Sequence, residues 1–407
     1  MRPLAALVLA TASLLAEVEI EGVSGVEMQS FLLHPESKHK NSITLYEELE
    51  AAYSADEFTL YGKLSAQQDY YDLAGDGSNR RTFLRLDELY GSYELEEGSL
   101  RAGRSVLFWG ALEARNIVDV FNPQELRNDP FATDKLGVWN ASYTHYTERG
   151  EISLIAKLYE EDQPMAAAPY AYYFFPEFTT YDEELKSEAS RYRPTLYLGW
   201  TGSTESEYPL DYALIFQHGY DSQRYFALDS TQFPPEFTQH AYLVNKVMSY
   251  NTLVVGATLV KLEALYADVI DEPLISDYAH GALGVEHTLQ PFEGGAELGL
   301  IAEYYRYKRF ESGTYSDLDL FETFQNDLFL GLRLTLNDVA DSSFVGGVVA
   351  DLAYTEQSWF AEFTTRLGES FRLNVDYRYI EPSKSEATAF ALLQRHQRIG
   401  AAVGYYF

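Results

Sequence analysis

The last quarter of the chain contains the stretch Leu328-Phe329-Leu330-Gly331-Leu332-Arg333-Leu334-Thr335-Leu336, in which leucine occupies every second position. Successive side chains of a β-strand point to opposite faces, so this stretch predicts a strand with one uniformly apolar face. A helix would instead mix Arg333 with the leucines on every side. The same alternation recurs over residues 371–379 and 399–407, so strands are the expected unit of the fold.

About 18 segments show this period of two, each close to the roughly 9–11 residues that a tilted transmembrane strand needs. A count of 16 strands is the natural alternative. The segments lie at residues 24–33, 43–53, 57–68, 82–95, 98–109, 138–148, 151–159, 191–203, 208–219, 237–250, 258–270, 279–290, 296–307, 324–336, 343–355, 358–367, 370–381 and 394–407.

The connections between these segments alternate in length. Short turns are expected at residues 96–98, 149–150, 292–295, 337–338 and 368–369. Long polar loops are expected at residues 69–81, 110–137, 160–190, 220–236 and 308–323. Short periplasmic turns and long outer loops are typical of outer-membrane barrels. The sequence therefore predicts an all-β, transmembrane, antiparallel up-and-down β-barrel, whose closure leaves no sheet edge in lipid.

The N-terminus has the features of a secretory signal. Arg2 is followed by an apolar run that is too short to span a bilayer. We expect residues 1–16 to be a signal peptide, cleaved after Ala12 or Ala16. No linker or break in composition follows, so residues 17–407 are expected to form a single barrel domain.

Composition excludes several classes of function. The net charge of −32 makes nucleic acid an unsuitable partner, because binding to phosphates needs a basic face. The absence of cysteine rules out disulfide scaffolds and cysteine-ligated metals, and no cofactor or metal is expected. Tyrosine occurs 33 times, which suits the aromatic girdles of a membrane barrel. The girdle candidates are Tyr143, Tyr304, Tyr354, Tyr379 and Tyr405.

The end of the chain resembles the C-terminal strand of bacterial outer-membrane proteins. It combines a terminal Phe407 with apolar residues at every second position, including Tyr405 and Val403. In that family this strand is recognised by the barrel-assembly machinery. The resemblance implies the same assembly signal here, and a location in the bacterial outer membrane in contact with lipid and lipopolysaccharide.

A longer stretch is similar to porin-like proteins of poorly known function. It comprises Leu86-Asp87-Glu88-Leu89-Tyr90, Leu100-Arg101-Ala102-Gly103-Arg104, Phe108-Trp109-Gly110 and Asn122-Pro123. This resemblance implies an outer-membrane channel and assigns no solute. It leaves the oligomeric state open.

The polar faces of the last strands supply candidates for the pore lining, together with the small residues Gly331 and Gly400. A patch of arginine opposed to acids would set a transverse field and an ion preference. Two further interpretations are an anion-binding patch, and mutual neutralisation that stiffens the wall. The charged candidates are Arg333, Glu362, Arg366, Arg372, Asp376, Arg378 and Arg398.

Three loops are further candidates. The loop at residues 111–137 either folds inward to narrow the pore or is an ordinary outer loop; its candidates are Arg115, Asp119, Arg127 and Asp129. The aromatic-rich loop at residues 164–181 either forms a binding surface or packs on the barrel rim. Residues Asp69, Asp72, Asp76 and Ser78 favour a turn over a calcium site, because the spacing of a calcium loop is missing.

These observations predict a porin-like channel for diffusion or facilitated passage of small hydrophilic solutes. The alternative is a barrel with a structural, adhesive or enzymatic role. The sequence contains no Gly-x-Ser-x-Gly, His-Glu-x-x-His or phosphate-binding glycine-rich motif, so an enzyme is not expected.

Overall fold

The computed structural model describes residues 18–33, 38–75, 78–132, 134–187, 189–291, 295–310, 322–384 and 388–407. The predicted signal peptide and both of its candidate cleavage sites lie outside these residues. So do Asp76 of the candidate calcium loop and most of the outer loop predicted at residues 308–323.

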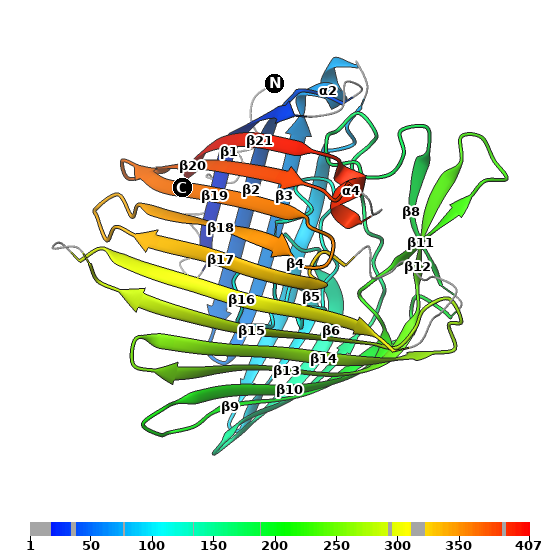
Figure 1. The fold of residues 1–407 in the computed structure, drawn as a ribbon. Helices are drawn as coiled ribbons and strands as arrows, with labels where there is room; N and C mark the ends of the chain where they lie inside the picture. The colour runs from blue at the N-terminus through cyan, green and yellow to red at the C-terminus, as the bar shows by residue number, and fades with distance from the viewer. Residues whose placement is uncertain are drawn as a thin grey trace.

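Eighteen antiparallel strands form one sheet that closes on itself (Figure 1). The count of 18 is thereby confirmed and the alternative of 16 is not. The strands in order around the barrel are β1 (Val18–Leu33), β2 (Asn41–Ala55), β3 (Phe58–Asp69), β4 (Phe83–Leu95), β5 (Gly98–Ser105), β6 (Val138–Thr147), β7 (Gly150–Lys157), β9 (Thr195–Ser203), β10 (Leu210–Tyr220), β13 (Leu243–Val255), β14 (Thr258–Ile270), β15 (Tyr278–Leu289), β16 (Glu297–Arg309), β17 (Asn326–Thr335), β18 (Ser343–Asp351), β19 (Gln357–Leu367), β20 (Phe371–Glu381) and β21 (His396–Tyr406).

The first and last strands close the barrel. β1 pairs with β21 from Val23 opposite Tyr406 to Leu33 opposite Gln397. The seam continues to the last residue, because Phe407 and Gly22 exchange two backbone hydrogen bonds of 3.0 and 3.1 Å. Closure pairs the edges that lipid would otherwise leave unsatisfied.

The strand faces follow the predicted alternation. On β17 the Leu330 side chain is 49% exposed on the outer surface, whereas its neighbour Phe329 is fully buried inside. Outward-facing leucine, valine and aromatic side chains recur on the other strands, including Leu198, Leu283, Trp359, Ile399 and Val403. An apolar band on the outside of a closed barrel matches a lipid environment.

The two ends of the barrel differ. Both the C-terminus and the short turns, such as residues 56–57 and 368–370, lie at one end, which is the periplasmic end of such barrels. The long loops lie at the other end. Among the described helices, α2 (Tyr70–Ala74) and α4 (Ala389–Leu393), neither is long and apolar enough to cross a membrane.

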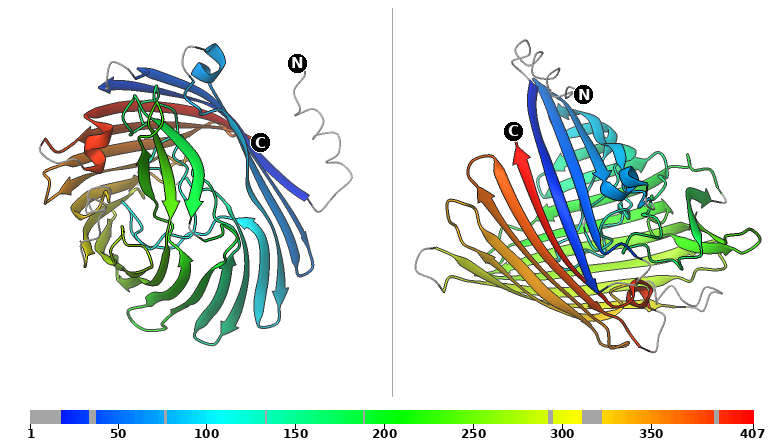
Figure 2. Two further views of the ribbon diagram at one scale, coloured as in Figure 1. Left: turned by 90° about the vertical axis from the view of Figure 1, so that its right-hand side faces the viewer. Right: turned by 90° about the horizontal axis from the view of Figure 1, so that it is seen from above.

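Two outer loops build a small second sheet that the sequence did not predict. It contains β8 (Thr180–Ser187), β11 (Tyr225–Asp229) and β12 (Glu236–Ala241), and it lies over the barrel mouth (Figure 2). Residues 237–250, predicted as one strand, belong to two: β12 pairs in parallel with β8, whereas β13 belongs to the barrel. The apolar alternation continues across this boundary and so does not reveal it.

The interior of the barrel also differs from expectation. The sequence predicted a polar lumen of small and charged residues, but one side of it holds a buried apolar cluster. Residues of the loop between β5 and β6 pack there against inward-facing residues of the wall. Members of the cluster are Leu112, Val118, Phe121, Ile215, Met248, Leu265, Ile301, Tyr305, Phe329 and Val349.

Candidate functional site

The loop between β5 and β6, residues 106–137, enters the lumen and is held there by the opposite wall. The carboxylate of Glu263, on β14, accepts backbone hydrogen bonds from Ala111 at 2.6 Å and from Ile117 at 2.7 Å. Leu112 and Val118 donate to the same carboxylate at 3.3 Å. One carboxylate therefore satisfies four N–H groups of a loop that lies far from it in sequence.

A second carboxylate extends this attachment. Glu303, on β16, accepts from the backbone N–H groups of Glu113 at 2.7 Å and Ala114 at 3.0 Å. The hydroxyl of Tyr305 donates to Glu303 at 2.6 Å and accepts the N–H of Arg115 at 3.1 Å. Residues 111–118 are thus fixed to β14 and β16 mainly through their backbone.

The far part of the loop is attached to the other side of the barrel. Asp129 lies 3.0 Å from the guanidinium of Arg398, on β21, and 3.4 Å from that of Arg378, on β20. Arg398 also pairs with Asp376. Gly400 faces Asp376 across the strand pair, and any side chain there would collide with its carboxylate.

Two further attachments lie beside this one. Asn128 accepts from the guanidinium of Arg81 at 3.0 Å and exchanges hydrogen bonds with Gln67 of β3. Arg85, on β4, pairs with Glu125 of the loop. The loop therefore contacts inward-facing residues of strands on both sides of the barrel, and it crosses the lumen.

The predicted pore-lining residues all lie on inward positions, but they do not form one patch. Arg378, Asp376 and Arg398 gather around Asp129, as described above. Arg366 and Arg372 lie near the periplasmic end, where Asp341 is 3.5 and 3.1 Å away.

The other two candidates lie apart from both groups. Arg333 pairs with Glu113 of the loop and lies 3.4 Å from Glu286. Glu362 accepts a hydrogen bond from Asn374. Each described arginine of the set thus has an acidic partner, which agrees with the neutralising interpretation at several points of the wall.

The constriction-loop candidates all have partners. Arg115 lies 3.2 Å from Glu322 of the outer loop between β16 and β17, and Asp119 pairs with Lys135 inside its own loop. Arg127 pairs with Glu125. Only Asp129 among the four candidates ties the loop to the wall by ion pairs.

The electrostatics of the loop follow from its burial. Burial alone would raise the pKa of the Asp129 carboxyl, but Arg378 and Arg398 outweigh that effect and hold this pKa below its usual value. Burial raises the pKa of the Asp119 carboxyl and lowers the pKa of its partner Lys135. Removal of either member of that pair would leave a poorly solvated charge.

Sequence reasoning missed Glu263 and Glu303, which hold the loop. Both are acidic residues at inward positions between apolar neighbours, and that is the only signal the sequence offers. It also missed an acidic part of the wall near the middle of β2, where Glu48 and Glu50 share Lys63 at 2.9 Å each and keep partly exposed carboxylates.

The aromatic-rich loop at residues 164–181 packs on the barrel rim, which is the second of the two interpretations given for it above. Phe178 is 70% exposed, but most of the rings are buried, including Tyr170, Tyr172, Tyr173, Phe175 and Tyr181. Phe175 stacks on Phe237 of the small sheet, with ring centroids 4.2 Å apart. The cluster therefore supports the small sheet.

The described part of the oxygen-rich loop after β3 begins with the short helix α2. Asp69 caps α2 and pairs with the buried Arg81 at 3.0 Å. Asp72 accepts hydrogen bonds from the backbone N–H groups of Arg80, Arg81 and Thr82 at 2.7–2.9 Å. Within the described part of the chain, no group of three or more histidines and acids is arranged to hold a metal ion.

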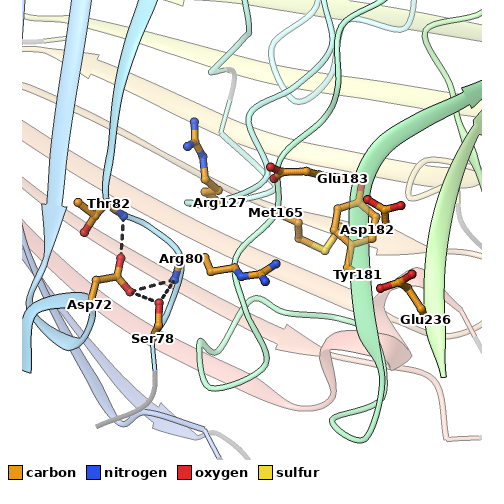
Figure 3. Close-up of a pocket in the computed structure, with 10 residues that line it drawn as sticks. All are labelled: Asp72, Ser78, Arg80, Thr82, Arg127, Met165, Tyr181, Asp182, Glu183 and Glu236. Carbon is orange, nitrogen blue, oxygen red and sulfur yellow. Dashed lines mark hydrogen bonds between the residues drawn. The ribbon is translucent and has the colours of Figure 1, made fainter. Parts of the chain in front are cut away.

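A pocket of about 660 Å³ opens above the loop in the lumen (Figure 3). Residues from the loop after β3, from residues 106–137 and from the small sheet surround it. They are Asp72, Ser78, Arg80, Thr82, Arg127, Met165, Tyr181, Asp182, Glu183 and Glu236. We call this pocket the vestibule.

A closed 18-stranded barrel with an apolar outer band, unequal ends and a loop inside the lumen defines the class: a porin-like β-barrel of the bacterial outer membrane. Solved structures share this fold across nearly the whole chain. OccAB2 of Acinetobacter baumannii is 10% identical, with a TM-score of 0.57 over 96% of this chain and 98% of that one. OccD3 of Pseudomonas aeruginosa is 8% identical, with a TM-score of 0.57 over 97% and 92%.

Wzi of Escherichia coli, a carbohydrate-binding barrel involved in group 1 capsule assembly, is also similar. It is 11% identical, with a TM-score of 0.52 over 99% of this chain and 87% of that one. Identities this low establish the fold alone. No protein-family model and no curated protein sequence matches the chain.

Proposed function

We propose that the protein is a channel that admits small hydrophilic solutes by diffusion or facilitated passage, and that it has no catalytic role. One observation carries the proposal: the loop at residues 106–137 crosses the lumen and is anchored to charged residues on both sides. A loop held in this way narrows the passage and places charges beside it, which is how pores select by size and charge.

Solvent-exposed charges on the inner wall support a water-filled path beside the loop. The side chain of Arg372 is 38% exposed and that of Glu50 is also 38% exposed, although both face inward. A charged side chain that is removed from water would destabilise the fold by several kcal/mol. These residues lie on the side of the barrel that the apolar cluster leaves uncovered.

A second candidate is a barrel that is closed and binds ligands at its outer surface. The apolar cluster in the lumen favours it, because a closed barrel is expected to fill its interior with bulky residues. The similarity to Wzi is consistent with it, since that protein is described as a carbohydrate-binding barrel. Contacts with lipopolysaccharide and with the barrel-assembly machinery are part of either proposal.

Conductance in planar lipid bilayers separates the two. The purified full chain should give discrete single-channel steps, and its reversal potential in a salt gradient should report the ion preference. A folded barrel that inserts but passes no current would overturn the channel proposal and leave the surface-binding barrel.

A further inference from the structure

The vestibule has charges of opposite sign on its two sides. Arg80, from the loop after β3, and Arg127, from the loop in the lumen, provide the positive side. Asp182 and Glu183 on β8 and Glu236 on β12 provide the negative side. Figure 3 shows the Arg80 side chain extending toward the strand that carries Tyr181.

Arg80 is the positive charge available to a ligand. Arg127 is already paired with Glu125. Asp72, which lines the pocket on the same side, accepts the backbone N–H of Arg80 and three other donors. No described carboxylate lies within ion-pair distance of the Arg80 guanidinium, and this residue lines the pocket.

Glu183 is its counterpart on the other side. Asp182 lies 3.4 Å from Lys186, and Glu236 accepts hydrogen bonds from Thr180 and Gln232. No described donor engages the side chain of Glu183, although its backbone carbonyl accepts from Gln239. Among the described residues that line the pocket, Arg80 is thus a cation without an ion-pair partner, and Glu183 and Glu236 are acids without one.

Met165 and Tyr181 add an apolar surface between the two sides. A simple anion would meet the carboxylates of the small sheet, and a simple cation would meet the two arginines. A solute that carries both charges satisfies both sides at once. The volume also lies in the roughly 300–1,000 Å³ range of small-molecule sites.

We propose that the vestibule binds zwitterionic solutes before they reach the loop in the lumen, with Arg80 holding the carboxylate and Glu183 and Glu236 holding the ammonium group. The site lies at the barrel mouth beneath the small sheet, on the entry side of the loop. Its role in uptake rests on the channel function proposed above, but binding itself does not.

The test is calorimetric titration of the full chain, in detergent micelles, with ω-amino acids of increasing chain length. Matched n-alkylamines and alkanoates carry only one of the two charges. We expect one chain length to bind best, at least tenfold more tightly than either single-charge analogue. Equal affinity for the zwitterion and for a single-charge analogue would overturn the proposal.

Variants test which side of the pocket binds each charged end of the ligand. Arg80→Gln should weaken the best ω-amino acid at least tenfold and leave the alkylamine unchanged, whereas Arg80→Lys should retain part of the affinity. Glu183→Gln combined with Glu236→Gln should weaken the same ligand and leave the alkanoate unchanged. The controls are Arg193→Gln, in the outer loop before β9, and Glu205→Gln, in the exposed turn between β9 and β10. Both should bind within twofold of the unmodified protein. Unchanged binding in both Arg80→Gln and the double variant would also overturn the proposal.

Conductance measurements distinguish a failure of the vestibule proposal from a failure of the channel proposal. A chain that conducts but gives no binding heat with any chain length overturns the vestibule site and leaves the channel intact. A chain that binds ω-amino acids with the expected pattern but carries no current supports the vestibule site and overturns the channel.

Discussion

The carboxylate of Glu263 accepts a 2.7 Å hydrogen bond from the backbone N–H of Ile117, 146 residues earlier in the chain. Three more N–H groups of the same loop point at this carboxylate. A buried N–H that loses its acceptor costs about 1–3 kcal/mol of stability. Glu263 is therefore the main anchor of the loop on the side of β14.

Glu263→Gln should loosen the loop. An amide keeps one acceptor oxygen but presents an NH₂ group to N–H donors, so at least two of the four hydrogen bonds are lost. We expect larger and noisier single-channel conductance in planar bilayers. The control Glu19→Gln removes the same charge from an exposed position of β1, and its conductance should change little. Identical current traces for Glu263→Gln and the unmodified protein would contradict the anchoring role.

The tie between Asp129 and the two arginines should be sensitive to acid. The pKa of Asp129 is lower in the folded protein than in the unfolded chain, where it is near 3.9. The ion pairs therefore stabilise the fold fully above about pH 3.9, and this stabilisation is lost as the pH falls through the pKa of the folded protein. Conductance should therefore stay level from pH 7 to about 4 and rise below that.

Asp129→Asn provides the matching test. This variant should show the raised conductance already at pH 7, with a weaker further change in acid. If Asp129→Asn and the unmodified protein have the same conductance at pH 7, the ion pairs do not hold the loop.

Arg372 and Arg378 should act differently on ion flow, although they lie six residues apart on β20. Arg372 is partly exposed near the periplasmic end, beside Asp341. Arg378 is engaged by Asp129 of the loop. Arg372→Ala should thus shift the reversal potential toward cations with little change in conductance, whereas Arg378→Ala should mainly raise conductance. The measurement is the reversal potential in a salt gradient, and similar phenotypes for the two variants would refute this division.

The effects of the two variants should differ in their dependence on salt concentration. Charges on a wide, wet wall are screened over about 8–10 Å at physiological ionic strength. The shift in Arg372→Ala should therefore shrink at high salt. The conductance of Arg378→Ala relative to the unmodified protein should persist, because it arises from the position of the loop.

The strands could be predicted because a period of two assigns every residue to one face. The leucines of β17 and the apolar residues of β21 lie outside, as their spacing required. Boundaries were less certain where alternation continues through a break, as between β12 and β13. The bulge at Asp87 of β4 does change the pattern, because the outward-facing apolar residue is Leu84 before the bulge and Leu89 and Tyr93 after it.

The anchoring of the loop could not be predicted from the sequence. Its donors are backbone N–H groups of residues such as Ala111 and Leu112, whose side chains carry no polar signal. Its acceptors, Glu263 and Glu303, lie 145–190 residues away on strands whose register decides the contact. By contrast, Asp129 and Arg398 were both selected as candidates, since charged side chains are visible in the sequence even when their pairing is not.

The two faces of β21 give a direct test of the register. Val403 faces outward, and Ala402 faces the lumen opposite Glu27 of β1. Val403→Arg should destabilise the barrel by roughly 2–4 kcal/mol if the site lies near the bilayer midplane. Ala402→Arg is the matched control, and Glu27 should accommodate its charge.

Reversible unfolding by urea in lipid vesicles measures both variants. Gly404→Ser would be a smaller change on the lumen side, but a Cβ there would lie 2.9 Å from a methyl group of Val23. Ala402→Arg is therefore the better control. Greater destabilisation by Ala402→Arg than by Val403→Arg would mean that the two faces are exchanged.

Glu47 is an exception on the outer surface. It lies on β2 between the outward-facing Leu45 and Leu49, opposite Ser24 of β1 and Ala66 of β3. No described donor or cation engages its carboxylate, and a charge on the lipid face is costly, though less so for glutamate than for the roughly 2–4 kcal/mol of arginine. Glu47→Leu should therefore increase the free energy of unfolding in lipid vesicles. Glu57→Leu, in the exposed periplasmic turn, removes the same charge outside the strands and should leave stability nearly unchanged. A loss of stability in Glu47→Leu would show that the carboxylate does not face lipid alone, and native gel mobility of the same variant would then reveal whether an oligomer has been disrupted.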